Sequence, residues 1–192
     1  MPHITKGVFK FINMKEIKLS QKGKVNNGKI TIVDDENYDY LMQWRWTAVK
    51  FKNTYYAMRN QYIGGGRDNP KYKYYAMHRE IMKTPDNMEC DHAFRNGLDN
   101  RKFIEIDGEL KINLRNCTHT QNSFNRTSYG MFKSLGVFGT KYKDKTYIFA
   151  AIRHNKKLIH LGRFKTEQEA ALAYNEAAIK YHGEFANLNI IN

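Results

Sequence analysis

Residues 77–126 read MHREIMKTPDNMECDHAFRNGLDNRKFIEIDGELKINLRNCTHTQNSFNR, and they decide how the middle of the chain folds. A short strand-like run ends at Asp91-His92, and Asn113-Leu114-Arg115 predicts a second strand. Thr118 is of a residue type that caps helices, so Asn122 is expected on the first turns of a helix. The stretch therefore predicts a strand–strand–helix unit with polar side chains at its junctions.

Four polar residues of this unit match the needs of phosphodiester hydrolysis. The reaction uses a divalent cation held by oxygen ligands, and Asp91 and Asn122 offer a carboxylate and an amide. A neutral histidine such as His92 suits the base that activates water, and Asn113 is a group that can fix its imidazole. Asp91 and His92 point to opposite sides of a regular strand, so we expect a bend or a strand end there. The alternative is that the four residues only cap and hydrogen-bond a hairpin and a helix.

The same stretch resembles the HNH (ββα-metal) nuclease motif, in particular the homing-endonuclease branch of phages and bacteria. The residues that carry the resemblance are His78-Arg79, Asp91-His92, Asn96-Gly97, Asp99-Asn100-Arg101, Asn113-Leu114-Arg115, Thr118 and Asn122. The resemblance implies that Asp91 and Asn122 hold a metal ion, Mg²⁺ with Mn²⁺ as the alternative. It also implies that His92 is the general base and that Asn113 orients it.

Two more histidines and an inserted run belong to this region. His78 matches the upstream histidine of the family and is expected in a structural or DNA-contacting role. His119 lies one turn before Asn122, where a solvated side chain is the commoner case and an accessory metal group is the alternative. Residues 101–112 depart from the family pattern and predict an added hairpin that turns at Asp107-Gly108.

The segment before the motif, residues 14–77, is expected to be rich in strands, with residues 1–13 as a loose extension. Residues 29–33 alternate apolar and polar side chains, and a polar turn or helix start follows at 34–37. The Tyr-rich runs at 54–59 and 71–77 predict a long hairpin, because a Gly, Asn and Pro-rich connection separates them. We expect the aromatic side chains of this segment to form its core.

Residues 134–189 predict a small domain of three strands and one helix, joined to the motif (residues 78–127) by a linker at 128–133. Thr166 with Glu169 is a capping box, an apolar stripe at helical spacing follows, and Gly183 is a helix stop. The strand region has Asp144 as its only acid, while the acids Glu167, Glu169 and Glu176 lie on the helix. The separation favours a DNA-binding face over a merely solvated one. Its basic residues are Lys141, Lys143, Lys145, Arg153, Lys156, Lys157 and Arg163.

This domain resembles the plant APETALA/ethylene-response-factor type of DNA-binding domain. The matching residues are Gly136-Val137, Ala150 to Arg153, His160 to Phe164, Glu169-Ala170-Ala171, Ala173-Tyr174, Ala177-Ala178 and Asn187-Leu188-Asn189. The resemblance implies binding of double-stranded DNA. Leu135, Phe138 and Thr140 stand where the plant proteins carry arginines, so the plant target sequence is not implied.

The composition agrees with a polyanionic partner. The chain of 192 residues has 32 Lys and Arg against 19 Asp and Glu, a formal net charge of +13. Basic charge favours nucleic acid, since no stretch pairs a basic face with an apolar one as a membrane-surface helix does. The sequence has no apolar run of membrane-spanning or signal-peptide length, so we expect a cytoplasmic protein. Two cysteines, Cys90 and Cys117, are too few for a disulfide framework and are expected as buried thiols on neighbouring strands.

The expected fold class is α+β, a ββα-metal (HNH) core with a β-rich N-terminal part and a small C-terminal domain of three strands and a helix. The expected function is a metal-dependent, homing-type DNA endonuclease that nicks or cleaves double-stranded DNA. One alternative is a DNA-binding regulator on a degenerate nuclease scaffold, and another is a nuclease or binder of structured RNA. The sequence leaves open the target site, the choice between nicking and double-strand cleavage, and the oligomeric state.

Overall fold

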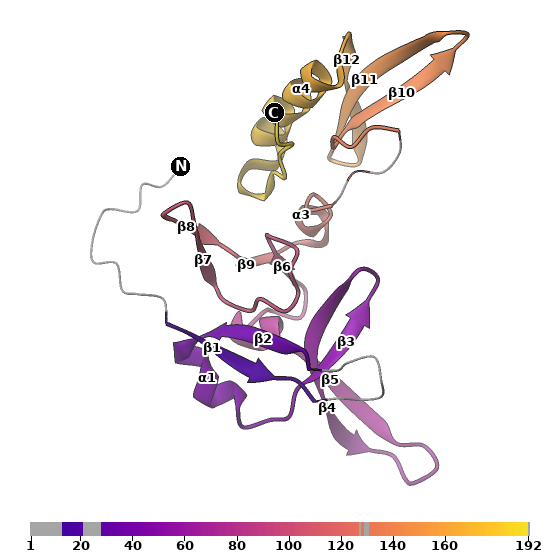
Figure 1. The fold of residues 1–192 in the computed structure, drawn as a ribbon. Coiled ribbons are helices and arrows are strands. Elements are labelled where there is room, and N and C mark those ends of the chain that lie inside the picture. Colours follow the sequence, from indigo (N-terminus) through magenta and orange to yellow (C-terminus); the bar gives the residue numbers. More distant parts are fainter. Residues whose placement is uncertain (1–12, 21–27, 127, 129–130, 192) are drawn as a thin grey trace. The chain divides into compact units, whose positions relative to one another are not determined.

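The protein is an α+β chain, described here from a computed structural model that covers residues 13–20, 28–126, 128 and 131–191. It divides into two compact units with the boundary between Asn116 and Cys117 (Figure 1). The range predicted for the nuclease motif, 78–127, is therefore shared between the units. Of the predicted extension, residues 1–12 lie outside the described part of the chain, as do residues 129 and 130 of the predicted linker.

The first unit begins with a two-stranded antiparallel sheet and a helix. β1 (Met14–Lys18) pairs with β2 (Ile30–Asp34), and α1 (Asp35–Leu41) follows β2 without a gap. Both the strand expected at 29–33 and the helix start expected at 34–37 are confirmed. Val33, Leu41 and Trp46 are buried in one core, where the Trp46 indole donates to the Leu41 carbonyl at 2.8 Å.

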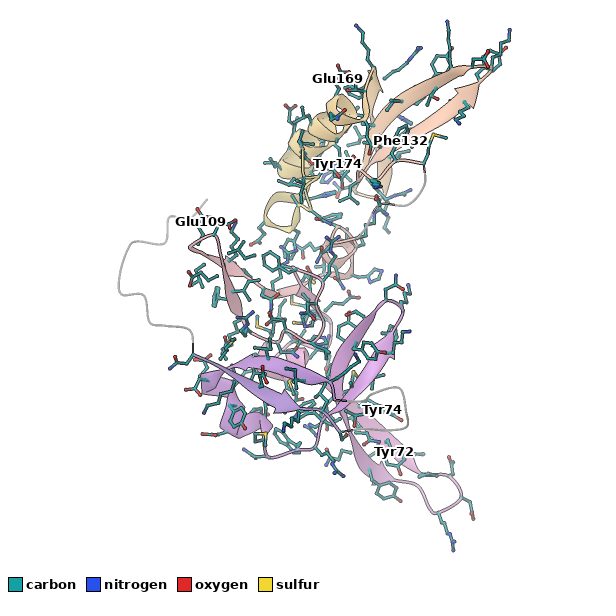
Figure 2. The ribbon with its side chains drawn as sticks, in the orientation of Figure 1. Tyr72, Tyr74, Glu109, Phe132, Glu169 and Tyr174 are labelled. Atoms are coloured by element: carbon teal, nitrogen blue, oxygen red, sulfur yellow. The ribbon has the colours of Figure 1, made fainter. Side chains whose placement is uncertain are left out.

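A three-stranded antiparallel sheet follows, in the order β3 (Thr47–Phe51), β4 (Thr54–Gly64) and β5 (Lys71–Ala76). It confirms the hairpin that the Tyr-rich runs predict. The expectation that its aromatics are core is wrong at the far end, because Tyr62, Tyr72 and Tyr74 are exposed. Figure 2 labels Tyr72 and Tyr74. Both faces of this end of the hairpin lack a covering element within the described part of the unit, so alternation along the strand buries neither face.

The strands of the predicted motif come next. α2 (Met77–Ile81) leads to β6 (Glu89–His92), which pairs with β9 (Leu114–Cys117). Between them, β7 (Phe103–Ile106) and β8 (Glu109–Ile112) form a separate antiparallel hairpin. Asp107 and Gly108 form its turn with φ of 54° and 74°, the left-handed backbone of a type I′ hairpin, as expected for that dipeptide. Cys90 and Cys117 are buried thiols on the paired strands, which is also as expected.

The second unit contains α3 (His119–Asn122), a three-stranded sheet and a long helix. The antiparallel sheet runs β10 (Val137–Tyr142), β11 (Lys145–His154), β12 (Lys157–Phe164), and α4 (Glu167–His182) packs on one face of it (Figure 1). Thr118 and Thr166 each cap their helix, as expected. Both form a full capping box, which was predicted for Thr166 alone. A short 3-10 turn, η2 (Gly183–Phe185), follows α4. None of the described helices is long and apolar enough to cross a bilayer.

The core between α4 and the sheet is built mostly from small helix residues. Ala170, Tyr174 and Ala178 are buried against Val137, Ala150 and Ile152 of the strands (Figure 2 labels Tyr174). Alanines on the helix let it approach the sheet closely, and Gly136 leaves room for the Tyr174 ring, since a Cβ there would lie 2.0 Å from it. The buried face of α4 also includes Ala171 and His182.

Candidate active site

His92 ends β6 in a buried position, with 5% of its surface exposed. Its Nε2 atom lies 3.2 Å from Oδ1 of Asn100, and Nδ2 of Asn100 donates to the Thr31 hydroxyl at 2.7 Å. The Thr31 hydroxyl in turn donates to the Leu98 carbonyl. Because the amide nitrogen of Asn100 is engaged with Thr31, its oxygen faces His92 and accepts the Nε2 proton. The chain of hydrogen bonds therefore selects the tautomer in which Nδ1 of His92 has the lone pair.

Two aromatic rings pack beside His92 and shield it from solvent. The His78 ring lies 4.8 Å from it and the Tyr56 ring 5.7 Å, centroid to centroid. Burial lowers the pKa of His92 below its ordinary value, although the hydrogen bond with Asn100 and the charges of Asp91 and Asp99 act in the opposite direction. A lowered pKa keeps the imidazole neutral at physiological pH, which is the form a general base needs.

His78 occupies the first turn of α2 and is 9% exposed. Burial, together with His92 and Arg79, lowers the pKa of His78 to about 3. Its Nδ1 atom is buried without a hydrogen-bond partner. His78 is therefore a neutral packing neighbour of His92, and the structural or DNA-contacting role expected from the sequence stays a prediction.

Asp91 precedes His92 and is also 5% exposed. Oδ2 of Asp91 accepts from Nε of Arg115 at 3.0 Å and from Nη2 at 2.8 Å, an ion pair between the adjacent strands β6 and β9. The sequence predicted either a bend or a strand end at Asp91-His92. β6 ends at His92, so the strand end is present. The pair with Arg115 fixes the position of a buried carboxylate before any ligand is bound.

Asn113 precedes β9 and is fully buried. Its Nδ2 atom donates to the carbonyls of Asp99 and Arg101, at 2.9 and 2.8 Å, while its Oδ1 atom is buried without a partner. Asn113 thus hydrogen-bonds the loop on both sides of Asn100, and Asn100 is the hydrogen-bond partner of the His92 ring. The orienting role predicted for Asn113 stays a prediction, and the contacts described here give it an indirect route through Asn100.

The loop that contains Asn100 is also tied to β2. Asn100 N donates to the Ile32 carbonyl at 2.7 Å, and Ile32 N donates to the Leu98 carbonyl at 2.9 Å. Asp99 and Arg101 form an ion pair across Asn100. Sequence reasoning placed Asn100 in the motif but gave it no role, because its partner Thr31 lies 69 residues away in the chain. The only signal for Asn100 was its place in the Asp99-Asn100-Arg101 run.

Asn122 and His119 lie on α3, in the second unit, with Asn122 half-buried and His119 exposed. The described part of the chain contains no cluster of three or more His, Cys, Asp or Glu side chains that would hold a metal ion by itself. A carboxylate from Asp91 and an amide oxygen from Asn122 are nevertheless hard donors of the kind Mg²⁺ takes, with water completing its shell. The residues fit the ion in donor chemistry, and their joint action stays a prediction.

The basic residues expected to bind DNA are all exposed on the second unit. On the sheet face opposite α4, the Arg163 guanidinium lies 4.3 Å above the Tyr147 ring, and Phe138 stacks on Phe149 at 5.7 Å. Lys141, Lys143, Lys145 and Lys157 lie along the β10–β11 hairpin and at the start of β12. The remaining two, Arg153 and Lys156, line a pocket at the β11–β12 turn.

No protein-family model matches the chain, and comparison with curated proteins finds no significant match. The functional reading of the buried cluster around His92 therefore rests on its residues and their geometry.

Proposed function

We propose that this protein is a metal-dependent DNA endonuclease of the HNH, homing type, which hydrolyses phosphodiester bonds in double-stranded DNA. The observation that supports it most is the state of His92, a buried imidazole next to Asp91 whose Nε2 proton is held by Asn100 and whose pKa is lowered. Burial of an imidazole costs free energy. A general base is the role that uses its burial, its fixed Nε2 proton and its lowered pKa.

In the proposed reaction, Nδ1 of His92 accepts a proton from a water molecule, and the resulting hydroxide attacks the scissile phosphorus in line. The P–O3′ bond breaks, and the 3′-oxygen leaves and takes up a proton from solvent. Oδ1 of Asn100 accepts from the Nε2–H of the imidazolium that forms, and the carboxylate of Asp91 stabilises the imidazolium charge. A divalent ion held by Asp91 and Asn122 would supply charge stabilisation at the phosphate.

Binding of the duplex is assigned to the second unit. Its sheet has an exposed face with cations and aromatic rings, opposite the face that α4 covers. A sheet of this kind can lie in the major groove while lysines at its edges neutralise phosphates. In this role the second unit acts as an APETALA/ethylene-response-factor type of domain, appended to a nuclease that cuts with other residues.

The test is nicking of supercoiled plasmid by the purified chain in Mg²⁺, with and without EDTA. Wild type should nick with Mg²⁺ and stop when the ion is chelated, and His92→Ala should lose nearly all activity. His154→Ala is the matched control, because His154 ends β11 in the second unit, outside the cluster around His92, and is expected to keep the wild-type rate. A His92→Ala variant that cuts at the wild-type rate would refute the assignment. Tight duplex binding without any nicking by wild type would instead favour a DNA-binding regulator.

A further inference from the structure

Within the second unit, a pocket of about 170 Å³ lies between the segment that follows α3 and the β11–β12 turn. We call it the basic pocket, and define it by Arg126, Arg153 and Lys156 with Phe124, Tyr174 and His182 in its walls. None of the residues lining it is acidic. Three permanent cations around one small cavity favour a small anion with several acceptor oxygens.

The walls of the basic pocket are held by ring stacking and by hydrogen bonds to backbone carbonyls. Phe124 stacks on His182 with the ring planes 6° apart and the centroids 3.6 Å apart. His182 Nε2 lies 3.0 Å from the Arg153 carbonyl, and Asn187 Nδ2 donates to the Arg126 carbonyl at 2.8 Å. The backbone carbonyls of both arginines are therefore held in place, and Nη1 of Arg153 donates to the Lys156 carbonyl at 3.4 Å. Groups held before binding lower the entropic cost of binding an anion.

The charges of the basic pocket favour a ligand over packing. Among the described residues, neither Arg153 nor Lys156 forms an ion pair with a carboxylate. The positive charge that Arg153 and Lys156 bring to the pocket is therefore available to an anion.

We propose that the basic pocket binds one backbone phosphate of duplex DNA, as an anchor separate from the exposed face of the sheet. This inference rests on the proposed function, since it takes duplex DNA as the source of the phosphate. Arg153 and Lys156 thereby differ from the other basic residues of the sheet, because they close around a phosphate next to the segment that follows α3. The anchor holds the DNA backbone at the segment that links α3 to the C-terminal sheet.

The test is the salt dependence of DNA affinity, measured by fluorescence anisotropy with a labelled random-sequence duplex and the full chain carrying His92→Ala. The double variant Arg153→Gln/Lys156→Gln should bind more weakly. Its slope of log K against log salt concentration should be shallower by about 1, the loss of one phosphate contact. Lys165→Gln/Lys180→Gln removes the same charge from exposed positions outside the pocket and should keep the wild-type slope. Arg153→Lys keeps the charge and should also keep the slope.

Further arms separate the possible failures. Equal slopes for the pocket variant and the Lys165/Lys180 control would overturn the anchor. If Lys141→Gln/Lys145→Gln still weakened binding in that case, duplex binding by the sheet would stand. Competition by inorganic phosphate that the pocket variant abolishes, with duplex binding unchanged, would reassign the pocket to a free anion. Stronger competition by duplex RNA than by duplex DNA would overturn the choice of DNA. Failure of wild type both to nick and to bind duplex would be a failure of the proposed function itself.

Discussion

The residue that best explains the state of His92 is Asn100, because it is the junction between the imidazole and the β2 strand. Its amide is oriented by the Thr31 hydroxyl, so it presents an acceptor to Nε2 and not a donor. The tautomer of His92 is therefore determined by a side chain in another part of the first unit. The carboxylate of Asp91 has a comparable support in Arg115.

Replacement of Asn100 by alanine should lower the nicking rate by roughly 10- to 100-fold, the usual effect of losing a residue that orients a reactive imidazole. The hydrogen bond that His92 donates to Asn100 raises the pKa of His92, so its loss should also move the acid limb of the pH–rate profile to lower pH. Asn96→Ala is the matched control, since Asn96 is exposed in the same loop. An unchanged pH profile together with a reduced rate would point to simple misfolding of the loop.

His78 predicts an acid sensitivity of the fold. Its pKa is about 3 in the folded chain against an ordinary value of 6.5. Below pH 6.5 the unfolded chain therefore binds a proton at His78 that the folded chain does not bind. The stabilising contribution is complete above pH 6.5 and decreases by at most about 1.4 kcal/mol per pH unit as the pH falls toward 3. His78→Phe should make the free energy of unfolding less steep between pH 6.5 and 4, as measured by urea denaturation. His160→Phe, at an exposed histidine, should leave the steepness as in wild type.

At the scale of elements, the loop between β6 and β7 is packed so closely on β4 that one of its glycines has no room for a side chain. A Cβ at Gly97 would lie 2.4 Å from the Tyr55 carbonyl and 2.8 Å from the Tyr56 ring, which packs beside His92. Gly97→Ala should destabilise the first unit by about 1–3 kcal/mol, the usual cost of overpacking. It should also lower the nicking rate through the displaced Tyr56. Gly66→Ala meets no atom within 4 Å and should change neither the unfolding midpoint nor the rate.

The elements themselves were largely predictable, because their signals are local. Thr118 and Thr166 predict helices, and Asp107-Gly108 predicts a hairpin. Each prediction depends only on hydrogen bonds or φ values within a few residues. The exposure of Tyr72 and Tyr74 was not predictable, since alternation along a strand does not say whether a second layer covers either face. The role of Asn100 was not predictable from local sequence either, because it depends on the approach of a loop to β2.

At the scale of the whole molecule, the net charge of +13 predicts that DNA affinity depends steeply on salt. Affinity for a random-sequence duplex should fall along a straight line of log K against log salt concentration, and nicking at limiting enzyme should fall with it. Titration of KCl in the anisotropy assay measures the slope. A slope near zero would contradict a binding mode based on phosphate contacts and would leave the basic surface unexplained.

Cys90 and Cys117 give the paired strands β6 and β9 a built-in reporter of local opening. Both residues are buried thiols, one directly before Asp91 and the other at the end of β9. A thiol reagent reaches them only when the protein opens, so the rate of labelling measures how often each position becomes accessible. Thiol labelling of the unaltered chain can thus measure how often the strand that bears His92 opens, with no probe introduced.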